Sequence, residues 1–444
     1  MTYVHRMKLK RLSNFVLLQG IHRMNLFESR RGNIDEIMES NRAIAEALIE
    51  VAEELWIPVV ESRIIVYLNR TIDSFSDSWI HLHCRFLNKT QMKELIEYFH
   101  IPQQFTLSNR SVCSGEEALL VTLFKLAFPE RLIDLEGTFG RDYSHWSRVI
   151  NEFMDYIIKY WSYLLFDNMS FWKKYIPECA NVIKRKMIEI GFQYPEELIG
   201  VDIDITYRVF ASIDDTISPT CRVGSGPATR GINARRKDPD IQRAFYTGWK
   251  KLHGLKFQTV CLPNGMDFHV FGPLSARRPD SFSLISSKLV PRLALLMNDM
   301  DVKYCCFGDS AYSREMYITT YKSGDNLTEW QIQENACFTS IREPHEWSYR
   351  DLKNYWKALD YRRILQVQSM KVGHMFLTAM ILKNAYTCFN GNEASEYFNY
   401  KGPSLEEWTS AGPRECSESF RMNLFAEETE ALDEILETEL DSML

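Results

Sequence analysis

Three acidic residues that lie far apart in the chain are the residues best suited to chemistry. Asp214 and Asp309 each follow a run of residues typical of a β-strand, and Glu346 lies 37 residues beyond Asp309 in a stretch with helical character. A carboxylate just past the end of a strand is held by a rigid element and projects where a cation can reach it. Carboxylate oxygens are among the hard ligands that Mg²⁺ prefers.

The spacing of these acids predicts a two-metal site. Asp214 and Asp309 are 95 residues apart, but they become neighbours if their strands pair. With Asp214 bridging, Asp309 and Glu346 would each hold one of two ions about 4 Å apart, a spacing suited to in-line phosphoryl displacement. One ion would activate the attacking water or 3′-hydroxyl, and the other would stabilise the leaving oxygen. Each acid taken alone is more typical of an ordinary turn or N-cap residue, but the joint order of the three acids favours the metal site.

Strand and helix patterns surround these acids in an order typical of an RNase H-like fold. Runs rich in β-branched and aromatic residues predict strands at Tyr207–Ile213, ending in Asp214-Asp215, and at Leu255–Leu262, Phe268–Phe271 and Tyr304–Phe307. Helical periodicity is present in Asp280–Met297 and in Glu329–Tyr355, where we expect Pro344 to interrupt the helix. The predicted fold class is therefore α/β, with a mixed-sheet catalytic domain.

The preceding part of the chain is predicted to be all-helical. Short helices are expected at Gly115–Ala127, Arg131–Phe139 and Ser144–Tyr160, with a glycine turn before the last, as in a helix-turn-helix. The last helix carries both acids and bases, so DNA binding and internal packing are both open to it. The predicted regions are a basic then helical segment at 1–60, a helical domain at 61–185, a nuclease domain at 195–390, a linker at 391–425 and an acidic tail at 426–444.

Charge is distributed unevenly along the 444 residues. The net charge is −7, but the last nineteen residues hold eight acids and no base, so the remaining body has a charge of +1. An acidic total therefore does not exclude a nucleic-acid substrate. A basic segment at 222–256 has a cationic excess of seven, and a loop of this kind binds either solvent or the DNA backbone. The candidate backbone contacts are Arg235, Arg236, Lys237, Lys250, Arg342 and Arg350.

Other chemically interesting residues are interpreted as structural. Arg342 and Arg350 lie four residues before and after Glu346, where they could orient that carboxylate, touch phosphate or form ordinary ion pairs. His345 and His374 are expected to be structural, because a metal-activated water needs no histidine base. The ten cysteines lack the pairing of a zinc site, and His81, His83 and Cys84 lack a second ligand pair. No apolar run is long enough to span a membrane.

Several motifs resemble those of the PIF/Harbinger transposases. Ile213-Asp214-Asp215-Thr216 resembles their "IDGT", the segment Gly308–Tyr312 resembles "GDSGY", and Glu346–Lys353 resembles "VEWAFGRLK". Weaker matches are Tyr246–Lys250 with "Y.GRK", Arg278–Ser281 with "HDS", and Met380–Asn384 with "ILHN". The resemblance covers about residues 80–390, and the three core motifs agree in both order and spacing.

This resemblance implies a DDE-type endonuclease whose metal ligands are Asp214, Asp309 and Glu346. It further implies two Mg²⁺ or Mn²⁺ ions, DNA cleavage and strand transfer at transposon ends, nuclear action, a Myb-like DNA-binding partner and, as an option, homo-oligomers. Asp215 stands where the family has glycine and Glu343 lies close to Glu346, so either acid is an alternative ligand. Two other functions stay open: a domesticated protein that binds DNA or partners without cutting, and an RNase H-like enzyme acting on RNA.

Overall fold

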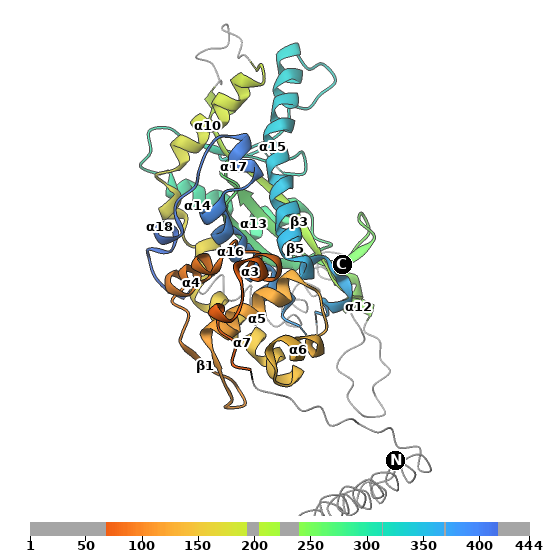
Figure 1. Cartoon of the computed structure of the whole chain (residues 1–444). Helices are drawn as coiled ribbons and strands as arrows, with labels where there is room; N and C mark the ends of the chain where they lie inside the picture. Colours follow the sequence, from red (N-terminus) through yellow and green to blue (C-terminus); the bar gives the residue numbers. More distant parts are fainter. Residues whose placement is uncertain (1–67, 193–203, 223–238, 313, 368–369, 416–444) are drawn as a thin grey trace, which may run out of the picture. The chain divides into compact units, whose positions relative to one another are not determined.

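The computed structural model describes residues 68–192, 204–222, 239–312, 314–367 and 370–415 (Figure 1). All of these residues belong to one compact unit. Within the described residues, no helix is both long and apolar enough to cross a membrane. The predictions for the basic N-terminal segment, for residues 223–238 of the basic segment and for the acidic tail lie outside these residues.

The first part of the described chain is mainly helical. Its elements are η1 (Ile72–Ser74), α3 (Asp77–Cys84), α4 (Lys89–Tyr98), β1 (Gln104–Thr106), β2 (Val112–Ser114), α5 (Gly115–Ala127), η2 (Leu132–Asp134), α6 (Leu135–Phe139), α7 (Tyr143–Trp161), α8 (Tyr163–Phe166), α9 (Met169–Trp172) and α10 (Ile176–Glu189). Side-chain oxygens of Ser114 and Asp142 cap α5 and α7, as expected at helix N-termini. The expectation of an all-helical region was incomplete, because β1 and β2 form an antiparallel hairpin.

The three helices of the expected helix-turn-helix are present, and α7 is used for packing. Its buried side chains recur every three or four residues, from Trp146 through Phe153 to Trp161, and this face packs on α5 and α16 (Val372–Asn390). On its more polar side, Asp155 pairs with Lys371 and His374. The buried face and the contacts of Asp155 give α7 a packing role within the fold.

The second part contains a mixed six-stranded sheet. Its strands are β3 (Val209–Pro219), β4 (Tyr246–Thr247), β5 (Leu252–Cys261), β6 (Asp267–Ser275), β7 (Cys305–Phe307) and β8 (Ile318–Thr319), in the order β4-β5-β3-β7-β8 with β6 also paired to β5. β3 is antiparallel to β5 and parallel to β7. The remaining helices are α11 (Asp204–Tyr207), α12 (Pro239–Phe245), α13 (Asp280–Ser286), α14 (Leu289–Leu296), α15 (Glu329–Tyr355), η4 (Lys357–Asp360), η5 (Arg362–Ile364), α17 (Glu393–Tyr397) and α18 (Leu405–Thr409).

The expected strands and helices occur in the expected order, but several boundaries differ. β6 continues to Ser275, and the helix expected at Asp280–Met297 is divided into α13 and α14. β3 does not end at Ile213; it continues through Asp214 and Asp215 to Pro219, paired with β5 as far as Gly254. Aspartate disfavours strands on average. Here the pairing continues because both carboxylates find partners on neighbouring elements and because β-branched residues follow them. The mixed sheet is consistent with an RNase H-like nuclease domain.

The predicted interruption of the long helix was also wrong. α15 runs unbroken from Glu329 to Tyr355 with Pro344 inside it, and it lies alongside β3 (Figure 1). A proline inside a helix removes one backbone hydrogen bond and costs roughly 3 kcal/mol. The helix persists because a buried face that includes Phe338, Ile341 and Leu352 packs against the rest of the fold.

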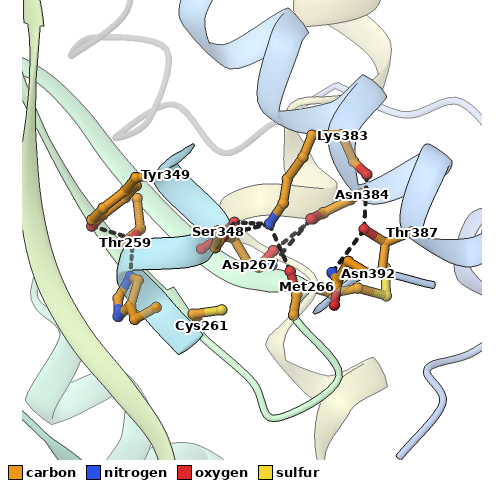
Figure 2. A network of polar contacts seen from close by, with 12 residues as sticks. Thr259, Cys261, Met266, Asp267, Ser348, Tyr349, Lys383, Asn384, Thr387 and Asn392 are labelled. Atoms are coloured by element: carbon orange, nitrogen blue, oxygen red, sulfur yellow. Dashed lines mark hydrogen bonds and ion pairs between the residues drawn. The ribbon is translucent and has the colours of Figure 1, made fainter. Parts of the chain in front are cut away.

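A buried ion pair ties α15 and α16 to the sheet. Lys383 of α16 donates to the Asp267 carboxylate of β6 at 2.7 Å, to the Ser348 hydroxyl of α15 at 2.6 Å and to the Gly265 carbonyl at 2.6 Å (Figure 2). Both charged side chains are fully buried. The neighbouring Asn384 holds the backbone N–H and carbonyl of Asp267 through its side-chain amide, which satisfies polar groups on an edge strand.

Replacing Lys383 with methionine should destabilise the fold strongly. The change leaves the Asp267 carboxylate buried without its counter-charge, and breaking a buried pair in this way costs about 3–5 kcal/mol. Urea unfolding followed by circular dichroism measures the loss. The double variant Lys383→Met with Asp267→Asn should recover part of it, and a double variant no more stable than Lys383→Met would show that the charge is not the cause.

Candidate active site

The adjacent acids of β3 face two different helices. The Asp214 carboxylate accepts a hydrogen bond from Arg342 of α15 at 2.8 Å. Asp215 instead accepts from Ser283 of α13 at 2.5 Å and from Tyr312 at 2.7 Å. This follows from the strand repeat, in which successive side chains point to opposite faces. Asp214 is therefore the acid on the same side of the sheet as Glu346.

Asp215 is committed to its own buried cluster. Lys256 lies 3.6 Å from its carboxylate and pairs with Asp280 at 2.6 Å. Burial and the neighbouring Asp280 raise the pKa of Asp215, while Ser283, Tyr312 and Lys256 oppose that rise. Lys256 belongs to the basic segment noted in the sequence, but this buried pairing removes it from any surface that DNA could contact.

The parallel pairing of β3 with β7 brings Asp309 next to Asp214. Ser212 is in register with Phe307, so Asp214 and Asp309 each lie two residues beyond that pair. The Asp309 charge is one of the influences that raise the pKa of Asp214. The Asp309 carboxylate also makes a local hydrogen bond, in which its Oδ1 accepts from the Ala311 backbone N–H at 2.9 Å.

Gly308 is the residue that permits this close approach. A Cβ atom at Gly308 would lie 2.9 Å from the Tyr312 ring and 3.0 Å from the Ile213 side chain. Such distances are shorter than normal van der Waals contacts, so only glycine fits between β7 and the turn that follows it. The glycine of the motif Gly308-Asp309-Ser310 thus has a packing role next to the acid.

Glu346 is linked to Asp214 through Arg342. It lies one turn after Arg342 on α15, and its Oε1 is 3.4 Å from Arg342 Nη1. The Glu346 side chain is 60% exposed, whereas that of Asp214 is 12% exposed. The alternative acid Glu343 is exposed and acts electrostatically on Tyr397 of α17, so it lies away from Asp214.

The electrostatics of Asp214 are set mainly by burial. Burial raises its pKa to about 6, Asp309 adds to the rise, and Arg342 together with the Asp215 backbone N–H opposes it. Two neighbouring carboxylates of which one is buried form a site that a cation would stabilise. Among the described residues, however, no three His, Cys, Asp or Glu side chains are close enough together to form a ready-made metal cluster.

A chain of hydrogen bonds fixes α15 against β3 and β5 behind Asp214. Burial, with Lys383 and Arg342, holds the pKa of His345 well below its ordinary value, so the ring is neutral. Tyr349 donates to the Asp214 backbone carbonyl at 3.0 Å, and Thr259 is 2.7 Å from Tyr349 (Figure 2). His345 Nε2 is 2.7 Å from Thr259 Oγ1, and its Nδ1 is 2.9 Å from Ser212 Oγ.

These contacts allow one continuous direction of donation. Because the Tyr349 proton goes to a carbonyl, Thr259 donates to the Tyr349 oxygen and His345 Nε2–H donates to Thr259. The His345 Nδ1 atom then accepts from Ser212. The chain gives His345 the structural role expected of it, and it joins the backbone of Asp214 to the helix that carries Glu346.

The sequence did not reveal Thr259 and Tyr349 as part of this site. The sequence signal for Thr259 was a polar residue within an otherwise apolar strand. In the structure Thr259 is in register with Asp214, on the neighbouring strand β5. Tyr349 lies three residues after Glu346, on the part of α15 that packs against the sheet.

The predicted DNA-backbone residues have different surroundings. Arg235, Arg236 and Lys237 lie outside the described residues. Lys250 is exposed in the turn between β4 and β5. Arg342 lines the candidate site, whereas Arg350 pairs with Glu393 and lies 3.9 Å from Asp351.

Of the histidines and cysteine considered in the sequence as a metal cluster, His81 is exposed, whereas His83 and Cys84 have packing contacts. His83 stacks on Trp79 and Phe124, and Cys84 is fully buried with a pKa raised by burial. His374 contacts Asp155 at 2.9 Å. The nine described cysteines are free thiols.

Comparison with known proteins found a similarity to one family. Residues 230–384 are similar to the family model of the DDE superfamily endonucleases. The matched range contains Asp309 and Glu346, begins after Asp214 and ends at Asn384, the residue that anchors β6. No curated protein and no solved structure matches the chain. This similarity to a DDE-type endonuclease domain suggests a nuclease or transposase.

The raised pKa of Asp214 predicts a specific pH dependence of stability. Since the folded-state pKa of about 6 lies above the ordinary aspartate pKa of 3.8, the native state binds the proton more tightly, and this group's contribution to stability increases as the pH falls through 6. Asp214→Asn removes the effect. The difference in unfolding free energy between wild type and variant should change by about 1.4 kcal/mol between pH 8 and pH 5. Urea titrations in metal-free buffer measure it, and a difference independent of pH would contradict it.

Tyr349→Phe tests the hydrogen-bond chain. The substitution keeps the ring but removes the hydroxyl that contacts Asp214 and Thr259, so we expect a loss of about 1–2 kcal/mol in unfolding free energy. Tyr361→Phe is the matched control, because Tyr361 is 41% exposed and should lose less than about 0.5 kcal/mol. If urea unfolding shows the same loss of unfolding free energy for both substitutions, the hydrogen bonds of Tyr349 do not stabilise the fold as we expect.

Proposed function

We propose that this protein is a divalent-metal-dependent DNA endonuclease of the PIF/Harbinger transposase type, which cleaves phosphodiester bonds and transfers strands. One observation carries the proposal: Asp309 lies just past the end of β7, the parallel neighbour of β3, where its charge acts on Asp214, and Arg342 links Asp214 to Glu346. Two of these three acids lie in the segment similar to DDE endonucleases. The order and spacing of the three motifs support the finer assignment.

The acids are chemically suited to Mg²⁺ or Mn²⁺. All three are carboxylates, the buried Asp214 is next to the negative charge of Asp309, and Glu346 is largely exposed. Asp214, Asp309 and Glu346 would hold the metal. When bound, two ions would polarise the scissile phosphate and increase the acidity of the attacking water or hydroxyl.

The remaining side chains contribute position and shielding. The series of hydrogen bonds that links Ser212, His345, Thr259 and Tyr349 holds the backbone of Asp214. Gly308 lets the turn that bears Asp309 approach β3. Arg342 is the cation nearest to the acids among the described contacts. We expect the basic residues Arg235, Arg236, Lys237 and Lys250 to hold the DNA backbone, with affinity that falls as salt increases.

The family resemblance supports further parts of the proposal. It favours cleavage at transposon ends, action in the nucleus and cooperation with a Myb-like DNA-binding partner. The internal packing of α7 agrees with dependence on such a partner, because the candidate recognition helix is engaged within the fold. Assembly into homo-oligomers is a further option that the family resemblance leaves open.

Two observations favour the alternative of a domesticated, non-cutting DNA- or partner-binding protein. The described residues contain no group of three ligands close enough to hold a metal, and an arginine occupies the position between two of the acids. The two functions predict different outcomes in a cleavage assay, since only an active enzyme depends on Asp309 and on metal.

A nicking assay on supercoiled DNA at low salt, with Mg²⁺ or Mn²⁺, tests the proposal. We expect wild type to nick and Asp309→Asn to lose more than about a hundredfold in rate, beyond the 10–100-fold typical of losing an outer-sphere partner. Asp301→Asn is the matched control, because Asp301 is an exposed residue shortly before β7. No metal-dependent nicking by wild type, or equal nicking by Asp309→Asn, would favour the non-cutting alternative.

A further inference from the structure

Arg342 is the residue through which the carboxylates on two different elements are joined. Its Nη2 atom is 2.8 Å from Asp214 Oδ2 on β3, and its Nη1 atom is 3.4 Å from Glu346 Oε1 on α15. The guanidinium is planar and carries several donors, so a single arginine can bind two carboxylates at once. Arg342 therefore provides the positive charge at the place where the two acids meet.

Both carboxylate oxygens of Asp214 already accept a hydrogen bond. Oδ1 accepts the backbone N–H of Asp215 at 2.9 Å, and Oδ2 accepts from Arg342. The Asp214 side chain is 12% exposed and that of Arg342 is 21% exposed. Because the backbone contact is fixed by the strand, a cation that binds Asp214 through Oδ2 has to compete with Arg342.

The charges of the site indicate that this competition can be won by a divalent ion. Asp214, Asp309 and Glu346 are three acids, whereas Arg342 supplies one positive charge. A guanidinium and a metal ion bound to the same oxygen would repel each other. The present position of Arg342 is also incompletely satisfied, because its buried Nε atom has no hydrogen-bond partner among the described residues.

We propose that Arg342 is an internal counter-cation that competes with the divalent metal ion for Asp214 and Glu346. Metal binding and the release of Arg342 from these carboxylates are then one coupled event. In the metal-free protein Arg342 keeps Asp214 and Glu346 paired. The apparent metal affinity is then the intrinsic affinity multiplied by the fraction of molecules in which Arg342 has left these carboxylates free. This inference rests on the proposed function, because it takes these acids to be the metal ligands.

Mn²⁺ binding to the full-length protein tests the competition without any DNA or cleavage. Isothermal titration calorimetry, with loss of the free Mn²⁺ resonance as a second readout, compares wild type, Arg342→Gln and Arg350→Gln. If Arg342 occupies the acids in about nine molecules of ten, its removal tightens Mn²⁺ binding about tenfold. Arg350→Gln is the matched control and should change affinity less than about twofold, since Arg350 pairs instead with Glu393.

Two further variants make each outcome decisive. Arg342→Lys serves if the glutamine variant does not fold: a lysine is a point charge that holds one carboxylate at a time, so it should give an intermediate affinity. Asp309→Asn identifies binding at the acidic site. Asp309-dependent Mn²⁺ binding that is equal or weaker in a folded Arg342 variant overturns this inference but leaves the proposed function. Wild type and variants that all lack Asp309-dependent binding overturn both.

Discussion

The parallel pairing of β3 with β7 is the constraint on which the candidate site depends. It places Asp214 and Asp309 two residues beyond the paired residues Ser212 and Phe307, although the described part of the chain passes through three other strands and three helices between them. The antiparallel pairing of β3 with β5 fixes the opposite edge of the same strand. Because β3 is held on both sides, the position of Asp214 is a property of the sheet and not of a loop.

The helix that carries Glu346 is fixed to this sheet by polar contacts in addition to apolar packing. One group of contacts runs through His345, Thr259 and Tyr349 to the backbone of Asp214. Another runs from Ser348 through Lys383 to Asp267. Buried polar groups of this kind stabilise one arrangement because any alternative leaves them unsatisfied. This explains how α15 keeps a defined position although it contains Pro344.

Much of the fold and part of the site could be predicted from sequence. The alternation of strand and helix patterns predicted β5, β6, β7 and α15 within a few residues, because each has a strong local pattern. Local patterns failed for β3, whose continuation through two aspartates depends on Arg342, Lys256 and Ser283 from distant parts of the chain. The role of Arg342 was equally hidden, since spacing predicted its contact with Glu346 but not the second contact with Asp214. The metal ligands themselves remain a prediction.

The two adjacent aspartates of β3 also protect the pairing of the strand. A slip by one residue would turn Asp214 toward α13 and Asp215 toward α15, and each acid would lose its own cation while entering surroundings built for the other. Gly254 adds a steric check at the far end, because a Cβ there would lie 2.7 Å from the Ser218 carbonyl. A misaligned central strand is thus destabilised by unpaired charges at the two aspartates and by a steric clash near Gly254. Both effects favour the native register of β3 during folding.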